Sequence, residues 1–135
     1  PPTKRSTKLP QGTERILLVE DDPGVRGFAA NSLRRLGYEI VAVCDGHEAL
    51  GILEMDQAFD LVFSDIEMPG GLNGIHMAEQ VREKLPDMPV LFMSGYPDKV
   101  MDQTGIFQGQ LDLMAKPFER LELANRVRNA LDRNP

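Results

Sequence analysis

Short apolar runs alternate with amphipathic segments along this 135-residue sequence, and this alternation limits the possible folds more than any other feature. Apolar runs typical of buried strands lie at 16–19, 38–43, 59–64, 89–93 and 111–115. Segments with the spacing of amphipathic helices lie at 23–36, 46–55, 74–85 and 119–133. After the fourth strand, Pro97, Gly105 and Gly109 leave room for only a short helix, expected near 98–103.

This order predicts a doubly wound α/β fold built on one five-stranded parallel sheet. Strands that alternate with helices through short connections run parallel, and right-handed crossovers place helices on both faces of the sheet. The strands are apolar throughout, as expected of strands that are covered on both faces. By length the chain forms one domain, predicted to occupy residues 14–133. Residues 1–13 contain three prolines and almost no apolar side chains, and are predicted to be a flexible linker.

The charge distribution and the cysteine content exclude several classes of function. The net charge is −6, and an acidic body argues against nucleic-acid binding, which needs clustered Lys and Arg. No apolar run approaches the roughly 20 residues that span a bilayer, so we expect no direct membrane contact. The single cysteine, Cys44, fits a reducing compartment and hence a cytoplasmic protein. We expect Cys44 to be a small, buried apolar residue.

Polar side chains stand at the carboxyl ends of the predicted strands, where open α/β sheets bind their ligands. Glu20 and Asp21 follow the first strand, Asp65 the third, Ser94 the fourth and Lys116 the fifth. Carboxylates this close repel one another unless a cation lies among them, and oxygen ligands suit Mg²⁺. A carboxylate can act as a nucleophile, while Lys and Ser stabilise phosphoryl oxygens. The set therefore predicts phosphoryl transfer onto Asp65.

Four segments resemble the receiver domain of two-component response regulators: VEDDPGVR (19–26), SDIEMPGGLNG (64–74), MSG (93–95) and AKPF (115–118). The resemblance covers roughly residues 14–133 and implies the flavodoxin-like strand order 2-1-3-4-5. It implies Mg²⁺ as the cofactor. It also implies a histidine kinase or a histidine phosphotransfer domain as the partner, whose phosphohistidine donates the phosphoryl group.

Position by position, the resemblance implies a metal site and a phosphoacceptor. Asp65 matches the phosphorylated aspartate, which also binds the metal. Asp21 matches the direct metal ligand, and Glu20 the acid that binds the metal through water. Glu67 would offer its backbone carbonyl to the metal. Asp22, in contrast, is predicted to cap the helix that follows it.

Other positions match residues that respond to the phosphoryl group. Ser94 matches the hydroxyl that contacts it on activation, and Lys116 the invariant lysine. Leu113 stands where the family usually has an aromatic switch residue. This replacement affects the usual coupling between rotation of the hydroxyl side chain and rotation of the aromatic ring. Glu67 and Tyr96 occupy positions that tune phosphate lifetime in the family, and we hypothesise that Tyr96 shields the acyl phosphate from water.

The resemblance also implies how the domain signals and where it belongs. Phosphorylation would switch the face made by the fourth helix, the fifth strand and the last helix, and a homodimer could form through that face. The leader, the PGG turn, MSGY and RVRNALDR resemble receivers at the C-terminal end of hybrid sensor histidine kinases. The expected chemistry is self-phosphorylation and autodephosphorylation.

The residues leave other interpretations open. The same acids and Lys116 fit a pseudo-receiver that binds partners without phosphate, or a Mg²⁺-dependent phosphohydrolase with Glu67 as proton donor. Flavin binding by this fold is disfavoured, because acids replace the Ser/Thr-rich phosphate loop after the first strand. Asp65 as a simple strand-end cap, and His47 or His76 as phosphoacceptors, are the remaining alternatives.

Overall fold

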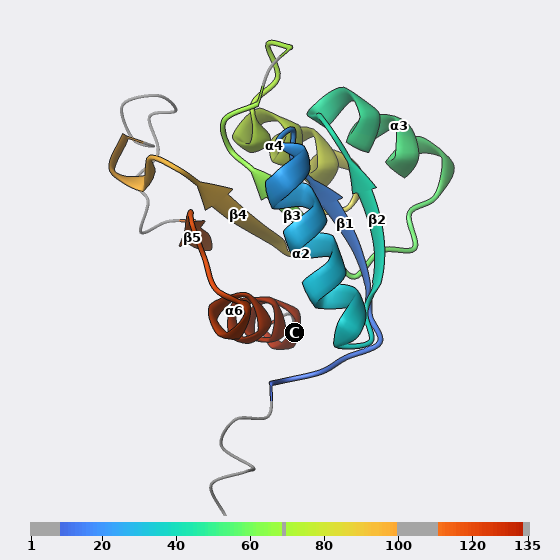
Figure 1. Cartoon of the computed structure of the whole chain (residues 1–135). Helices are drawn as coiled ribbons and strands as arrows, with labels where there is room; N and C mark the ends of the chain where they lie inside the picture. Colours follow the sequence, from blue (N-terminus) through green and yellow to red (C-terminus); the bar gives the residue numbers. More distant parts are fainter. Residues whose placement is uncertain (1–8, 69, 100–110, 134–135) are drawn as a thin grey trace, which may run out of the picture.

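A five-stranded parallel sheet lies between two layers of helices in the computed structural model of the chain, which describes residues 9–68, 70–99 and 111–133 (Figure 1). The strands are β1 (Arg15–Val19), β2 (Glu39–Val43), β3 (Leu61–Asp65), β4 (Val90–Ser94) and β5 (Leu113–Ala115). The helices are α2 (Pro23–Arg35), α3 (Gly46–Met55), α4 (Gly74–Lys84) and α6 (Arg120–Asp132). The strand order β2-β1-β3-β4-β5 confirms the predicted topology.

Each face of the sheet is covered by its own pair of helices. Helices α3 and α4 pack on one face, and α2 and α6 on the other (Figure 1). Successive side chains of a strand point to opposite faces. Leu17 and Val19 therefore join the core under α3 and α4, whereas Ile16 and Leu18 join the core under α2 and α6. The fully apolar strands predicted this two-sided burial.

Side-chain caps begin three of the helices. Asp22 accepts a hydrogen bond from the backbone N–H of Gly24 at 2.8 Å, which confirms its predicted role as the cap of α2. Asp45 caps α3 and Asn73 caps α4 in the same way. Because these caps set where the loops at the strand ends turn into helices, they also shape the rim that carries the polar residues.

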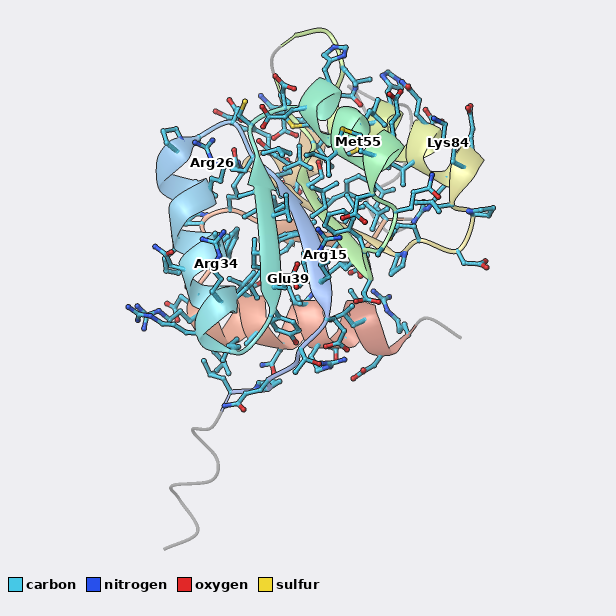
Figure 2. The ribbon with its side chains drawn as sticks, turned by 90° about the vertical axis from the view of Figure 1, so that its right-hand side faces the viewer. Arg15, Arg26, Arg34, Glu39, Met55 and Lys84 are labelled. Atoms are coloured by element: carbon cyan, nitrogen blue, oxygen red, sulfur yellow. The ribbon has the colours of Figure 1, made fainter. Side chains whose placement is uncertain are left out.

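An arginine covers one outward-facing carbonyl on each edge strand. Arg34 of α2 donates to the carbonyl of Ile40 on β2 at 3.1 Å. Arg126 of α6 donates to the carbonyl of Leu113 on β5 at 2.6 Å. An unpaired strand edge is a template for further strand pairing, and these contacts occupy part of each edge. At the start of β1, far from the rim with the polar residues, Arg15 pairs with Glu39 at 2.7 Å (Figure 2).

Two strands begin two residues later than predicted. The third strand was predicted from 59 but begins at Leu61, because the N–H of Phe59 bonds the carbonyl of Gln57 in a turn. The fifth was predicted from 111 but begins at Leu113. In both cases an apolar residue packs against the core before the strand ladder starts. Apolar runs report burial, which extends beyond the hydrogen-bonded ladder.

The segment after β4 contains a short 3₁₀ turn, Pro97–Lys99. The helix predicted at 98–103 lies mostly outside the described residues. Cys44 was predicted to be buried, and this is wrong: it is exposed, because it follows the last residue of β2 at the open rim of the sheet. Within the described residues, every helix is too short or too polar to cross a membrane.

Candidate functional site

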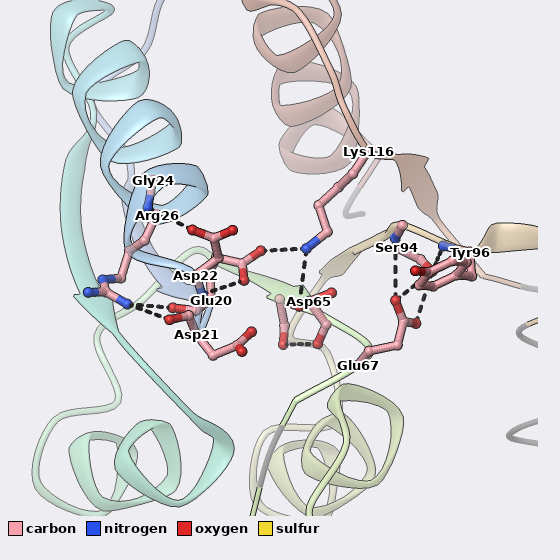
Figure 3. A network of polar contacts seen from close by, with 12 residues as sticks. Glu20, Asp21, Asp22, Gly24, Arg26, Asp65, Glu67, Ser94, Tyr96 and Lys116 are labelled. Atoms are coloured by element: carbon pink, nitrogen blue, oxygen red, sulfur yellow. Dashed lines mark hydrogen bonds and ion pairs between the residues drawn. The ribbon is translucent and has the colours of Figure 1, made fainter.

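Three carboxylates meet at the carboxyl end of the sheet. Glu20 and Asp21 directly follow β1, and Asp65 is the last residue of the neighbouring strand β3. One carboxylate oxygen from each residue lies within 4.8 Å of the corresponding oxygens of the other two (Figure 3). Glu20 is fully buried and Asp65 is 2% exposed, whereas Asp21 is exposed. The cluster therefore combines two buried acids with one that faces solvent.

Lys116 supplies the positive charge that faces this cluster. It follows β5, and its Nζ donates to Oε1 of Glu20 at 2.8 Å and lies 3.2 Å from Oδ2 of Asp65 (Figure 3). The cation therefore bridges the two buried carboxylates. It leaves one unit of negative charge on the buried pair uncompensated if both are ionised, which is costly away from water.

Burial and the uncompensated negative charge shift the pKa values of Asp65 and Lys116. Burial, followed by the negative charge of Glu20, raises the pKa of Asp65 to about 7, although Lys116 opposes the shift. Burial alone would lower the pKa of Lys116, but its hydrogen bond to Glu20 and the charge of Asp65 outweigh burial and raise it. Lys116 therefore stays charged, and Asp65 is the group whose ionisation the site resists.

The site fits a hard divalent cation. Oδ1 of Asp65 is buried and has no hydrogen-bond partner among the described residues, although a buried polar atom is normally satisfied. One carboxylate oxygen each from Asp65, Glu20 and Asp21 forms an oxygen-only donor set. Mg²⁺ prefers such ligands and usually combines one or two carboxylates with water and phosphate oxygens. The residues present therefore match the predicted cofactor.

The loop between β1 and α2 is held by its own hydrogen bonds. The N–H of Asp22 donates to Oε2 of Glu20 at 2.9 Å. The guanidinium of Arg26 donates to the carbonyls of Glu20 at 2.9 Å and Asp21 at 3.3 Å. Sequence reasoning missed this role of Arg26, although the residue closes the segment VEDDPGVR. These bonds orient the two acids that follow β1.

Ser94 lies beside Asp65 on the neighbouring strand. In the ladder of β3 and β4, Asp65 pairs with Met93, and Ser94 follows as the fully buried last residue of β4. The Ser94 hydroxyl donates to both oxygens of the Glu67 carboxylate at 2.9 Å, and this bond was also missed from sequence. Tyr96 is 61% exposed, and its backbone N–H donates to the Ser94 oxygen at 3.0 Å.

The two histidines lie apart from the carboxylate cluster. His76 is an exposed residue of the first turn of α4. His47 is exposed near the start of α3, and its Nε2 lies 3.3 Å from the carbonyl of Gly70. Neither contributes an atom to the group of carboxylates around Asp65.

Comparison with known proteins gives consistent matches. The family model described as the response regulator receiver domain matches residues 16–128. The response regulator protein FleR of Pseudomonas aeruginosa is 38% identical over 122 residues, which are 90% of this chain and 25% of FleR. The chain spans about half the length of other curated relatives.

Solved structures agree with this match. The receiver domain of the hybrid histidine kinase CckA is 40% identical, with a TM-score of 0.70 over 87% of this chain and 98% of that one. A response regulator receiver protein from Sinorhizobium medicae is 26% identical, with a TM-score of 0.80 over 91% of this chain and 98% of that one. These relatives are response regulators and receivers, not pseudo-receivers or phosphohydrolases.

Proposed function

The chain belongs to the response regulator receiver domain family, whose role is phosphoacceptor signalling, and we propose that Asp65 is its phosphoacceptor. One observation carries this proposal: Asp65, which is 2% exposed, ends a central strand, with two further carboxylates and the amine of Lys116 around its own carboxylate. Acids are rarely buried in this way without a functional reason, and perturbed pKa values cluster at reactive sites.

The chain's own residues account for the chemistry of the transfer. An oxygen of Asp65 attacks phosphorus and forms a P–O bond, while the P–N bond of the donor phosphohistidine breaks and leaves its electron pair on the imidazole. Lys116 lies 3.2 Å from Asp65 and neutralises charge on the phosphoryl oxygens. Ser94 is the hydroxyl that contacts the product.

The metal belongs to the same proposal. Asp21 and Asp65 would hold Mg²⁺ directly, Glu20 through water, and Glu67 through its backbone carbonyl. Bound Mg²⁺ would neutralise charge shared by the carboxylates and the phosphoryl oxygens. The orphaned Oδ1 of Asp65 and the converging oxygens of Glu20 and Asp21 support this assignment.

The partners follow from the phosphoryl donor. We propose a histidine kinase or a histidine phosphotransfer domain as the donor, and a place for this domain within a hybrid sensor histidine kinase. The likeness to the CckA receiver supports the second point. A cytoplasmic location, a linker at 1–13 before a domain at 14–133, and a homodimer through the face of the fourth helix, fifth strand and last helix remain part of the proposal.

A chemical test maps the acceptor directly. The protein is incubated with Mg²⁺ and phosphoramidate, whose P–N bond stands in for phosphohistidine. Borohydride then reduces any aspartyl phosphate to homoserine, and peptide mass spectrometry locates it. The proposal predicts homoserine at position 65 in the wild type and none in Lys116→Ala or without phosphoramidate. Homoserine at position 21 instead, or none at all, would contradict the assignment of Asp65.

A further inference from the structure

Two hydrogen-bond donors beside Asp65 are already occupied by a single internal anion. The Ser94 hydroxyl donates to both oxygens of the Glu67 carboxylate at 2.9 Å (Figure 3). The next backbone N–H, that of Gly95, donates to Oε1 of the same carboxylate at 3.3 Å. The bonds from Ser94 to Glu67 are partly buried, whereas the bond from Gly95 is exposed.

The position of these donors relates them to the phosphoacceptor. Strands β3 and β4 are neighbours, and the N–H of Ile66 bonds the carbonyl of Met93 at 3.0 Å. Ser94 and Gly95 therefore follow β4 where Asp65 ends β3, at the same rim of the sheet. A phosphoryl group on Asp65 would add three strong acceptor oxygens and about two negative charges at this rim.

The capacity of the donors is limited. A serine hydroxyl has one hydrogen, and a backbone amide has one. While both are directed at Glu67, they are not available to phosphoryl oxygens, and the Glu67 carboxylate also repels a second anion placed next to it.

From this geometry we propose that Glu67 acts as an internal competitor of the phosphoryl group for the hydroxyl of Ser94 and the N–H of Gly95. This inference rests on the phosphoacceptor role of Asp65. Glu67 is a positioning residue, since it acts through Ser94 and Gly95. In one state these donors hold Glu67, and in the other they hold the phosphoryl group, so removal of the Glu67 carboxylate shifts the population toward the second state.

Beryllofluoride, an unreactive mimic of the phosphoryl group, measures this competition. Its affinity in the presence of Mg²⁺ is determined by NMR titration for the wild type and for Glu67→Ala. We expect Glu67→Ala to bind roughly tenfold more tightly, a change of about 1.4 kcal/mol. Glu79→Ala is the matched control, because it removes the same charge from an exposed position of α4 and is expected to leave the affinity unchanged within about twofold.

A double-mutant cycle separates competition for the donors from a general effect of charge. If Glu67 acts through the Ser94 hydroxyl, then Glu67→Ala improves affinity much less in a Ser94→Ala background. An equal gain in both backgrounds would show that Glu67 acts through its electric field alone, and would overturn the proposal. Glu67→Leu, whose side chain has no hydrogen-bond acceptor, supplies a second variant in case the alanine variant is poorly folded.

The metal-free and mimic-free protein provides an independent readout. The amide proton of Gly95 is expected to shift upfield in Glu67→Ala and to stay unchanged in Glu79→Ala, because only the first substitution removes its acceptor. No shift at Gly95 would contradict the contact. If beryllofluoride binds none of these proteins, the wild type included, the phosphoacceptor role itself is rejected. If it binds the wild type and Glu67→Ala with equal affinity, only the competition is rejected.

Discussion

Among individual residues, Asp65 is 2% exposed, yet one of its carboxylate oxygens has no hydrogen-bond partner among the described residues. Lys116 compensates only part of the charge that Asp65 and Glu20 carry together. An ionised carboxylate in this position reduces the stability of the fold. The site therefore stores an unfavourable interaction that a bound cation would relieve.

The raised pKa of Asp65 predicts how stability depends on pH in EDTA. An unfolded aspartate has a pKa of about 3.9, whereas that of folded Asp65 is about 7, so the folded state binds the proton more tightly. Wild-type stability is therefore lost as the pH rises through this window. Asp65→Asn does not titrate, and we expect it to exceed the wild type by about 1–3 kcal/mol at pH 8, and by less at pH 5.

Urea denaturation of both proteins at the two pH values measures this difference. Asp87→Asn, which removes an exposed carboxylate from the loop before β4, is the control and should change stability by less than about 0.5 kcal/mol. A stability difference between Asp65→Asn and the wild type that is the same at pH 5 and pH 8 would contradict the raised pKa.

Tyr96 provides a second prediction about a single residue. Tyr96 is 61% exposed and lies two residues beyond Ser94, and we predict that its ring limits access of water to the acyl phosphate. Hydrolysis after removal of the phosphodonor should be roughly threefold faster in Tyr96→Ala, which corresponds to a barrier lowered by about 0.6 kcal/mol. Tyr96→Phe keeps the ring and should retain the wild-type rate. An unchanged rate in Tyr96→Ala would remove the ring from any account of phosphate lifetime.

Between elements, α6 holds the chain segment that precedes β1. Arg128 of α6 pairs with Glu14 and donates to the carbonyl of Gln11 at 3.1 Å and to the hydroxyl of Tyr38 at 3.3 Å. The N–H of Gly12 bonds the carbonyl of Leu36, and a side chain at Gly12 would collide with Tyr38 and Arg128. This close approach requires glycine, and these contacts hold residues 11–12, near the end of the predicted linker, against the domain.

We expect Arg128→Ala to destabilise the domain by about 1–2 kcal/mol, because it removes several charge-assisted hydrogen bonds at once. The hydrogen bond from Arg128 lowers the pKa of Glu14. The contribution of this pair to the stability of the domain is therefore complete above about pH 4.3, and it is lost as the pH falls below that value. Chemical denaturation at pH 7 and pH 3.5 tests both statements. Arg120→Ala, at an exposed position of the same helix, is the control; an equal loss there would show that the contact with Glu14 contributes nothing specific.

Most elements were predictable from the sequence, and the exceptions have physical reasons. The period of apolar residues placed α3 at 46–55, as observed, and the fully apolar strands predicted cover on both faces. The starts of β3 and β5 were misplaced because Phe59 is buried, and Leu111 partly buried, without joining the ladder. Periodicity reports which residues are buried, while strand ends depend on backbone hydrogen bonds.

The site was predictable where it depends on topology, and not where it depends on loop conformation. Parallel strands end at one rim, so Glu20, Asp21 and Asp65 had to converge. The bond between Glu67 and Ser94 depends on how the chain turns after β3, and no period in the sequence reports that turn. The contacts of Arg26 with backbone carbonyls escaped prediction for the same reason.

For the whole molecule, cation binding at the rim should stabilise the entire domain. A ligand that binds only the folded state adds about 1.4 kcal/mol when its concentration is ten times its dissociation constant. Mg²⁺ should therefore raise the melting temperature at pH 8, relative to an equal ionic strength of NaCl. Asp21→Asn should abolish this increase, because it removes the exposed carboxylate of the cluster. An undiminished increase in that variant would place the cation elsewhere.

The family match and the geometry of the rim together support one central proposal, that this domain accepts a single phosphoryl group on Asp65. The most direct test is the intact mass after incubation with acetyl phosphate, with and without Mg²⁺, for the wild type and Asp65→Asn. We predict one added phosphoryl group in the wild type, dependent on Mg²⁺ and absent from Asp65→Asn. The same adduct on Asp65→Asn, or none on the wild type with Mg²⁺ present, would contradict the claim.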